Sequence, residues 1–293
     1  MHPRHIVLGL CVAAFWGLNF VVVTIGLTGF PPFLLAGLRF MLAALPALIL
    51  PRPRIPLGRL VLVASALFVG QFALLYPAMA VGMPPGLASI GLQVQAFLTI
   101  GIATTLLRER PTARQIAGGA VAFAGLILVG ATVGTNGMTL AGFVLLLGAA
   151  LSWATGNVLI RGTGPVNMSA MVSWMSLIAA PPLLILSLLF EGPDRIASAV
   201  AGATWLTGGA IVYTALVSTT FGYAVWGHLI ERYPAATAAP FSLLVPVTGT
   251  ISAAVILGES FGPLRLAGMV LILVGLAVLL FGPRPRTATA DPG

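Results

Sequence analysis

Residues 60–107 have the sequence LVLVASALFVGQFALLYPAMAVGMPPGLASIGLQVQAFLTIGIATTLL and contain no charged side chain. A helix needs about 20 apolar residues to cross the ~30 Å hydrocarbon layer of a membrane, so this stretch is long enough for two crossings. The segment GMPPG at residues 82–86 interrupts it, because Gly and Pro favour a turn over a continuing helix. The stretch therefore predicts two consecutive transmembrane helices that run in opposite directions.

The rest of the chain has a similar composition. Of its 293 residues, 59% are hydrophobic and only 7% are charged, and the mean hydropathy is +1.08. A soluble domain carries about 25% charged residues, because its surface has to face water. We therefore expect an all-α integral membrane protein that is surrounded by the lipid bilayer.

Apolar runs separated by charged or Gly/Pro-rich breaks predict ten transmembrane helices in all. The expected ranges are 6–27, 33–50, 60–81, 86–107, 113–133, 139–160, 169–190, 204–230, 236–257 and 264–282. The first range lacks the short apolar core and the small-residue cleavage site of a signal peptide, so we expect it to be retained. An even number of helices places both termini on the same side of the membrane.

The formal net charge is +8, and the basic residues counted in it are all arginines, with no lysine. In a soluble protein it would suggest nucleic-acid binding, but here the arginines lie mostly between the predicted helices. Eleven fall on the side of the N-terminus, and only Arg195 and Arg265 fall in loops on the other side. Because cytoplasmic loops are enriched in basic residues, we expect both termini in the cytoplasm, in the cell (inner) membrane. No nucleic-acid partner is expected.

The chain resembles itself when it is shifted by 150 residues, so that Pro84 aligns with Pro234 and Glu109 with Glu259. Further identical pairs are Ala88/Ala238, Leu107/Leu257, Gly118/Gly268 and Gly125/Gly275. Chance is the alternative explanation in a chain so rich in Ala and Leu. The glutamate pair favours a true repeat, because the chain contains only four glutamates.

Each repeat would contain five helices, the first within residues 1–133 and the second within residues 139–282. Because five is an odd number, the second repeat would be inserted upside down relative to the first. Inverted repeats around a site at the membrane midplane are typical of carriers that work by alternating access. Residues 283–293 are expected to form a disordered cytoplasmic tail.

Short motifs follow one another in a characteristic order over the ten predicted spans. They are Trp16-Gly17-x-Asn19-Phe20, Arg39-Phe40, Glu109, Gln115, Gly118 and Gly125 in the first half, and Ser152-Trp153, Tyr223, Pro246, Gly258-Glu259, Gly268 and Gly275 in the second. With this pattern the sequence resembles the EamA-type carriers of the drug/metabolite transporter superfamily over nearly its whole length. The resemblance implies a ten-helix carrier with a central cavity that exports amino acids or other metabolites.

Trp16, Asn19 and Phe20 share one face of the first predicted helix, at spacing i, i+3 and i+4. Trp153 and Asn157 share a face of the sixth, which the repeat places in the equivalent position. In a cavity, these side chains would offer stacking area and amide hydrogen bonds to a zwitterionic solute. The alternative is that the asparagines join packed helices, which is common in membranes.

Thr219, Tyr223 and Trp226 form a narrow stripe on the eighth predicted helix. They either bind substrate or belong to the aromatic belt at the membrane surface. On the fourth helix, Gln93 and Gln95 point in directions about 160° apart if the helix is regular. The two side chains cannot then line the same cavity, and we expect Gln93 to be the one that lines it.

Arg39 is expected about six residues inside the second helix, roughly 9 Å along its axis. Its side chain either reaches the outer interface or pairs within the protein, or it contacts a substrate carboxylate. Pro246 predicts a kink in the ninth helix, which is either a simple bend or a hinge. Gln71 and Tyr76 on the third helix are weaker candidates for the lining.

Glu109 and Glu259 each precede a helix that begins near a proline. A carboxylate suits the positive N-terminus of a helix, so we expect each to stabilise the helix that follows it. Thr112 and Gln115 additionally predict a capping box at the start of the fifth helix.

Catalytic motifs are missing from the sequence, which argues against an enzyme. Few residues could act in catalysis or bind a metal, namely His2, His5, His228 and Cys11, and no metal or cofactor is expected.

The scarcity of charge argues against phosphorylated substrates. We therefore expect a small-molecule exporter of neutral or zwitterionic metabolites, most of all amino acids including aromatic ones. Alternatives are an exporter of aromatic or cationic drug-like compounds and a lipid scramblase. The sequence leaves the oligomeric state open and is compatible with a monomer.

Overall fold

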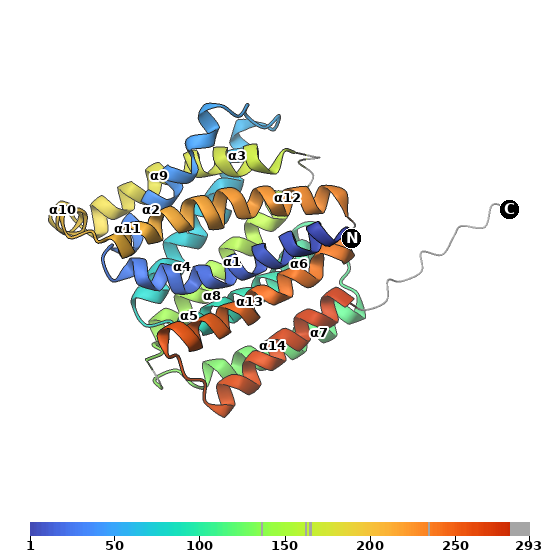
Figure 1. Cartoon of the computed structure of the whole chain (residues 1–293). Coiled ribbons are helices and arrows are strands. Elements are labelled where there is room, and N and C mark those ends of the chain that lie inside the picture. The colour runs from blue at the N-terminus through green and yellow to red at the C-terminus, as the bar shows by residue number, and fades with distance from the viewer. Residues whose placement is uncertain (136, 162, 164–165, 234, 282–293) are drawn as a thin grey trace.

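The computed structural model describes residues 1–135, 137–161, 163, 166–233 and 235–281, and within these residues the regular structure is entirely helical. The helices run roughly parallel to one another in a bundle (Figure 1). In the part of the chain that the structure describes, nine helices are long and apolar enough to cross a membrane, and the shorter apolar segment Pro32–Leu48 completes the ten predicted spans. This confirms the expected all-α membrane fold. The predicted disordered tail, residues 283–293, lies outside the described residues.

The first five spans consist of ten helical segments. They are α1 (Pro3–Leu27), α2 (Pro32–Ala43) with the 3₁₀ turn η1 (Leu45–Leu48), α3 (Leu57–Ala64) with η2 (Ser65–Gly70) and α4 (Gln71–Ala80), α5 (Pro85–Gly91) with η3 (Leu92–Val94) and α6 (Gln95–Leu106), and α7 (Ala113–Gly130). The predicted range of each span agrees with the observed one to within a few residues.

The second five spans are α8 to α14 without α10. They are α8 (Leu140–Leu159), α9 (Met168–Phe190), α11 (Trp205–Val212) with η4 (Tyr213–Phe221) and α12 (Gly222–Arg232), α13 (Ala235–Leu257) and α14 (Pro263–Phe281). The short helix α10 (Pro193–Ala201), which was not predicted, lies in the connection between the seventh and eighth spans.

The two ends of the bundle are named here by the loops they carry. The terminus face is the end at which α1 begins, and it includes loops 49–56 and 107–112. The opposite face includes loops 28–31 and 258–262. Large apolar side chains are exposed around the sides of the bundle, with 71% of Leu106 and 79% of Val255 accessible. Such a surface is stable only against lipid.

Both repeats contain an irregular helix at the same position. The segments η2 in the third span and η4 in the eighth are π-helical, and the shift of 150 residues places Ser65–Gly70 inside Tyr213–Phe221. π-helical turns are rare and frequently mark functional sites. The shared irregularity supports the repeat independently of the aligned residues.

The last spans of the two repeats, α7 and α14, pack reciprocally through glycines. A Cβ added at Gly125 would lie 2.5 Å from the carbonyl oxygen of Gly268, and one added at Gly275 would lie 2.5 Å from that of Gly118. Only glycine allows two helix backbones to approach so closely. Gly118 aligns with Gly268 in the repeat, and Gly125 with Gly275, so this antiparallel contact is the one expected of inverted repeats related by a twofold axis.

Candidate functional site

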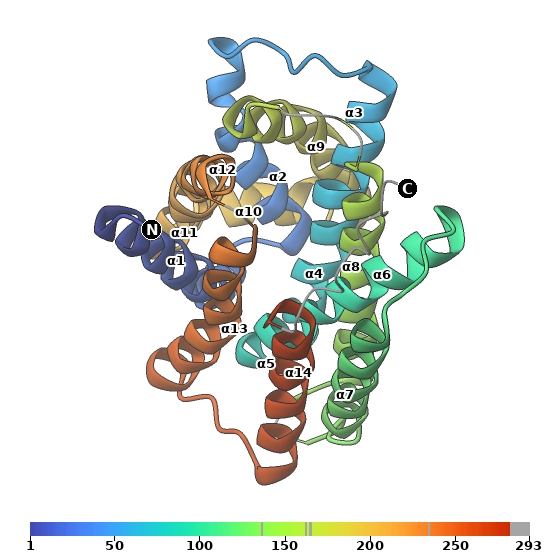
Figure 2. The same ribbon diagram turned by 90° about the vertical axis from the view of Figure 1, so that its right-hand side faces the viewer.

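A cavity of about 450 Å³ lies at the centre of the bundle, between helices of both repeats. This volume is in the range of small-molecule binding pockets. The lining extends from Ser89, in the half nearer the opposite face, to Ile160, Met168 and Leu280 at the terminus face. The cavity therefore opens toward the terminus face, onto which Figure 2 looks.

Tight packing of α1, α5 and α13 closes the cavity toward the opposite face. The hydroxyl of Thr248 on α13 donates to the carbonyl of Ala13 on α1, at 2.9 Å. A Cβ added at Gly17 would lie 2.6 Å from the backbone nitrogen of Gly249, and one added at Gly249 would lie 2.7 Å from Ser89. No space for a solute remains between these helices in this conformation.

Three aromatic side chains form one side of the cavity, which we call the aromatic wall: Trp16 of α1 with Tyr223 and Trp226 of α12. The ring of Trp16 lies 5.2 Å from that of Tyr223 and 5.6 Å from that of Trp226, between centroids. Its indole nitrogen donates to the carbonyl of Ser218, at 2.8 Å. The three rings therefore support one another, and they present a fixed apolar surface with a hydroxyl at its edge.

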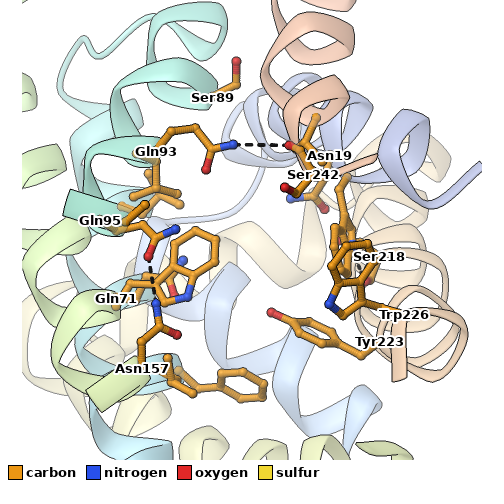
Figure 3. A pocket seen from close by; sticks show the side chains of 18 of the residues that line it. Asn19, Gln71, Ser89, Gln93, Gln95, Asn157, Ser218, Tyr223, Trp226 and Ser242 are labelled. Atoms are coloured by element: carbon orange, nitrogen blue, oxygen red, sulfur yellow. Dashed lines mark hydrogen bonds between the residues drawn. The ribbon is translucent and has the colours of Figure 1, made fainter. Parts of the chain in front are cut away.

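The side of the cavity across from the aromatic wall carries amides, and we call it the amide wall. Its residues are Gln71, Gln93, Gln95 and Asn157 (Figure 3). Asn157 Nδ2 donates to Gln95 Oε1 at 2.7 Å. Gln93 Nε2 lies 3.4 Å from the carbonyl oxygen of Ser242, across the cavity on α13. Most of the groups that could bind a solute here are thus already engaged with the protein.

The prediction that Gln95 points away from the cavity is wrong, since both Gln93 and Gln95 line it. The prediction assumed a regular α-helix, but the 3₁₀ turn η3 (Leu92–Val94) separates α5 from α6. A 3₁₀ helix rotates by about 120° per residue, so two residues at i and i+2 point about 120° apart instead of about 160°. Both side chains can then reach the same space.

Arg39 of α2 is 3% exposed and lines the cavity. Its Nε and Nη2 donate to Thr219 Oγ1 at 3.0 and 2.8 Å, and its Nη1 donates to the hydroxyl of Tyr76 at 2.7 Å. The guanidinium carbon lies 4.4 Å from the ring centroid of Phe72. Of the alternatives for Arg39, the structure therefore favours pairing inside the protein over extension to the interface. The pairing is with neutral groups, and no carboxylate of the described residues forms an ion pair with Arg39.

Most of the predicted site residues line the cavity: Trp16, Asn19, Phe20, Arg39, Gln93, Trp153, Asn157, Tyr223 and Trp226. Thr219 does not. It is fully buried behind Arg39, and its hydroxyl also donates to the carbonyl of Thr214 at 2.8 Å. The structure therefore gives Thr219 the role of positioning Arg39, in place of the direct contact predicted from the sequence.

Pro246 also lies outside the lining, within the continuous helix α13. Its carbonyl accepts from the hydroxyl of Thr250, at 2.9 Å. A hinge at Pro246 stays a prediction.

The carbonyl oxygen of the Asn19 side chain, Oδ1, is buried and has no hydrogen-bond partner among the described residues. A buried polar atom is nearly always satisfied in a folded protein. Asn19 also lines the cavity beside Ser242. An N–H or O–H donor of a bound molecule would satisfy this oxygen.

Several lining residues were not predicted from the sequence, among them Phe68, Phe72, Ser218 and Ser242. Phenylalanine and serine are common in membrane helices, so neither type is a signal by itself. The π-helical segments were the signal that could have identified Phe68 and Ser218, but the amino-acid pattern does not reveal such segments.

The glutamates lie outside the cavity, at the helix ends. Glu259 Oε2 accepts from the backbone N–H of Gly86, at 2.8 Å, so this residue caps α5 and not the following helix α14 as predicted. Glu109 instead forms an ion pair with Arg161, at 2.8 Å. The helix that follows Glu109 is capped by Thr112 and Gln115, and the predicted capping box is thereby confirmed.

Comparisons with known proteins agree with this architecture. A model of the EamA-like transporter family matches residues 4–131 and 140–281. Proteins named "Probable amino-acid metabolite efflux pump" from Salmonella typhimurium and Escherichia coli are 44% and 42% identical, and in each case the match covers 98% of both chains.

More distant relatives extend the comparison. A "Probable terminal-alkyne amino-acid exporter" of Streptantibioticus cattleyicolor is 28% identical over 90% of this chain and 89% of its own length. One solved crystal structure is similar with a TM-score of 0.64 at 20% identity, covering 95% of this chain and 97% of the other. At that identity the likeness supports the fold alone.

Proposed function

Because this chain belongs to the EamA-like transporter family, we propose that it exports amino acids and similar small neutral or zwitterionic metabolites, aromatic ones included. Family membership also identifies it as a multi-pass membrane transporter and not as an enzyme. The proposed mechanism is alternating access through the central cavity. The names of the two efflux pumps and of the alkyne amino-acid exporter support the substrate class.

The observation that carries the proposal is the buried charge of Arg39. A guanidinium has five N–H donors, and three of its hydrogen bonds here go to the neutral hydroxyls of Thr219 and Tyr76. Taking a charge out of water is costly unless an opposite charge compensates it. No described residue that lines the cavity is acidic. A substrate carboxylate would supply the missing negative charge.

The remaining groups fit the rest of an amino acid. The aromatic wall offers ring faces for stacking with an apolar or aromatic side chain and for a cation–π contact with an ammonium group. Asn19 Oδ1, which lacks a partner among the described residues, would accept a hydrogen bond from that ammonium. Together, these residues form a site for a molecule with one negative, one positive and one apolar part.

The arginine distribution supports a terminus face on the cytoplasmic side of the inner membrane, with both termini inside the cell. The cavity would then be open to the cytoplasm in this conformation, which is the state that loads a substrate for export. Aromatic drug-like compounds are the alternative cargo, and the aromatic wall favours them. The positive charge of Arg39 disfavours cationic ones.

Counterflow in proteoliposomes would test the proposal. Vesicles that contain the full-length chain and an unlabelled amino acid are expected to take up the same amino acid in radiolabelled form, whereas vesicles without protein do not. A panel should include aromatic amino acids and the matching amines without a carboxyl group. Uptake of the amines with none of the amino acids would contradict the proposal and favour the drug-like alternative.

A further inference from the structure

A second hollow lies at the opposite face, apart from the central cavity. Its volume is about 530 Å³, and it is enclosed by the ends of α1 and α4, the loop before α2 and the short helix α10. The helix α10 lies at the end of the bundle remote from the N-terminus (Figure 1). Arg195 contributes a charge to the lining, and among the described residues no carboxylate lies within ion-pair distance of it. A solute that carries a carboxylate would find a partner here.

Three helices line both the central cavity and this hollow. On each helix, one residue of either lining is found seven positions from one residue of the other. Seven positions correspond to about 10 Å along the axis and return to the same side of the helix. The pairs are Phe20 and Leu27 on α1, Arg39 and Pro32 on α2, and Phe72 and Met79 on α4. The two spaces therefore approach each other along the same sides of three neighbouring helices.

One layer of side chains separates the two spaces along these helices, and we call it the plug: Val23, Leu35 and Tyr76. Each of the three lies between the two lining residues of its own helix, three or four positions from either. Their side chains are 1%, 0% and 0% exposed, and they line neither space. All three belong to the same buried apolar cluster. The barrier between the cavity and the hollow is therefore thin and almost entirely apolar.

A hydrogen bond to the cavity arginine holds one member of the plug. Arg39 Nη1 donates to the hydroxyl of Tyr76, at 2.7 Å, and thereby ties α2 to α4. A carboxylate binds a guanidinium more strongly than a neutral hydroxyl does. A substrate carboxylate at Arg39 would therefore displace the hydroxyl of Tyr76. A buried hydroxyl that has lost its partner is costly, so Tyr76 would then gain from leaving the plug.

We propose that the hollow is the release site of the transporter and that the hydrogen bond between Arg39 and Tyr76 is the latch of the plug. When a substrate carboxylate binds Arg39, the latch opens and the plug separates. The solute then passes between α1, α2 and α4 into the hollow, where Arg195 receives the carboxylate. The glycine contact between α1 and α13 stays closed during this step. This proposal rests on the amino-acid export proposed above.

Cysteine accessibility would show which side of α1 opens. Val23→Cys places a thiol in the plug. Val21→Cys is the matched control, because it lies one turn after Gly17, on the side of α1 that packs against α13. Both valines are 1% exposed, and Cys11→Ser removes the native cysteine. The full-length chain in proteoliposomes is treated with a water-soluble methanethiosulfonate on both sides of the membrane.

An amino acid that is active in counterflow should raise the labelling rate of Val23→Cys and leave that of Val21→Cys unchanged. Tyr76→Phe removes the latch hydroxyl and should raise the labelling of Val23→Cys without any solute, by about ten-fold, the effect of one hydrogen bond.

Faster labelling of Val21→Cys in place of Val23→Cys would overturn the proposal and assign the exit to the contact between α1 and α13. Unchanged labelling of Val23→Cys in the Tyr76→Phe background, or during exchange of an amino acid, would also overturn it. The outcome is separate from the substrate assignment. If Tyr76→Phe opens the plug but counterflow detects no amino acid, the plug stands and the proposed substrate is wrong.

The hollow itself is tested at Ala80, which lines it, and at the neighbouring Val81, which does not. Both residues are exposed. Ala80→Trp should fill the hollow and slow counterflow of amino acids by about ten-fold, as overfilling a site does, whereas Val81→Trp should stay close to the parent protein. Arg195→Gln should slow amino acids by about three-fold and leave the matching amines unchanged. Equal rates in the two tryptophan variants, or equal effects of Arg195→Gln on acids and amines, would overturn the release site.

Discussion

The aromatic and amide sides of the cavity each carry an asparagine, but they differ in which hydrogen-bonding groups they leave free. On the amide wall, Asn157 donates to Gln95, at 2.7 Å, so its amide is used within the protein. Beside the aromatic wall, Asn19 leaves a buried oxygen without a partner among the described residues, and Arg39 has only neutral partners there. Asn19 and Asn157 lie on equivalent helices of the two repeats, yet the structure places them in different roles.

This difference indicates where a substrate would be recognised. A group that already has its hydrogen bonds gains little from a ligand, whereas an unsatisfied buried group gains the full interaction. The aromatic side of the cavity is therefore expected to select the substrate, and the amide side is expected to hold α6 and α8 together. Variants on the two sides of the cavity test this distinction.

The largest effect is expected for Arg39→Gln. Removing the charge should lower kcat/KM for amino acids by about 100-fold, because losing one partner of a buried charge pair costs about 2–5 kcal/mol. Transport of the matching amines, which lack a carboxylate, should change far less. Arg39→Lys, which keeps the charge without the planar fork, should fall in between. An equal loss for acids and amines would show that Arg39 acts on folding and not on the carboxylate.

A smaller effect is expected for Asn19→Ala. It should lower kcat/KM by about ten-fold, the effect of one hydrogen bond, and leave the melting temperature nearly unchanged. The matched variant Asn157→Ala should do the reverse, with a loss of stability of about 0.6–1.7 kcal/mol and a smaller change in transport. Transport assays and thermal unfolding of both variants separate the two effects. If Asn157→Ala impaired transport more than Asn19→Ala, the distinction between the walls would be wrong.

The smallest effect is expected from pH, because no described residue in the cavity lining carries a carboxyl group. Outside the spans, burial raises the pKa of Glu259, while the N–H groups of Gly86 and Leu87 and the charge of Arg265 partly offset the rise. A raised pKa means that the closed opposite face binds the proton more tightly than the open one.

Acidification of the solution at the opposite face should therefore favour the conformation described here. This preference should fade as the pH rises through the pKa of Glu259. Spin labels at Val81→Cys and Ser260→Cys, both exposed positions, in a chain that also carries Cys11→Ser, would detect this as a modest change in their distance distribution, and Glu259→Gln should abolish it. A shift of similar size in Glu259→Gln would assign the pH dependence to another group.

The span positions were predictable because hydropathy is a local property of the chain. Residues 86–107 were expected in the fourth span, and the structure has Pro85–Leu106. The short helix α10 was not predicted, because its nine residues are too few to cross a membrane. Gln95 was assigned to the wrong direction, because a pattern of side-chain directions assumes a regular helix and η3 is not one.

The partners of the polar groups were not predictable in the same way. Glu259 was expected to cap the next helix, yet it accepts from the backbone N–H of Gly86, 173 residues earlier in the chain. Arg39 was expected to be either paired or exposed, but its partner Thr219 lies 180 residues away. Sequence rules that relate neighbouring residues do not predict hydrogen-bond partners that lie so far apart in the chain.

The amino-acid sequence alone specifies the ten membrane spans, the repeat and many of the aromatic and polar side chains that line the cavity, because each depends on composition and spacing within one helix. The three-dimensional packing sets which amides are satisfied, which face is closed and which group each glutamate contacts. These outcomes depend on which helices become neighbours, and a hydrogen bond between helices is set by the position of both of them.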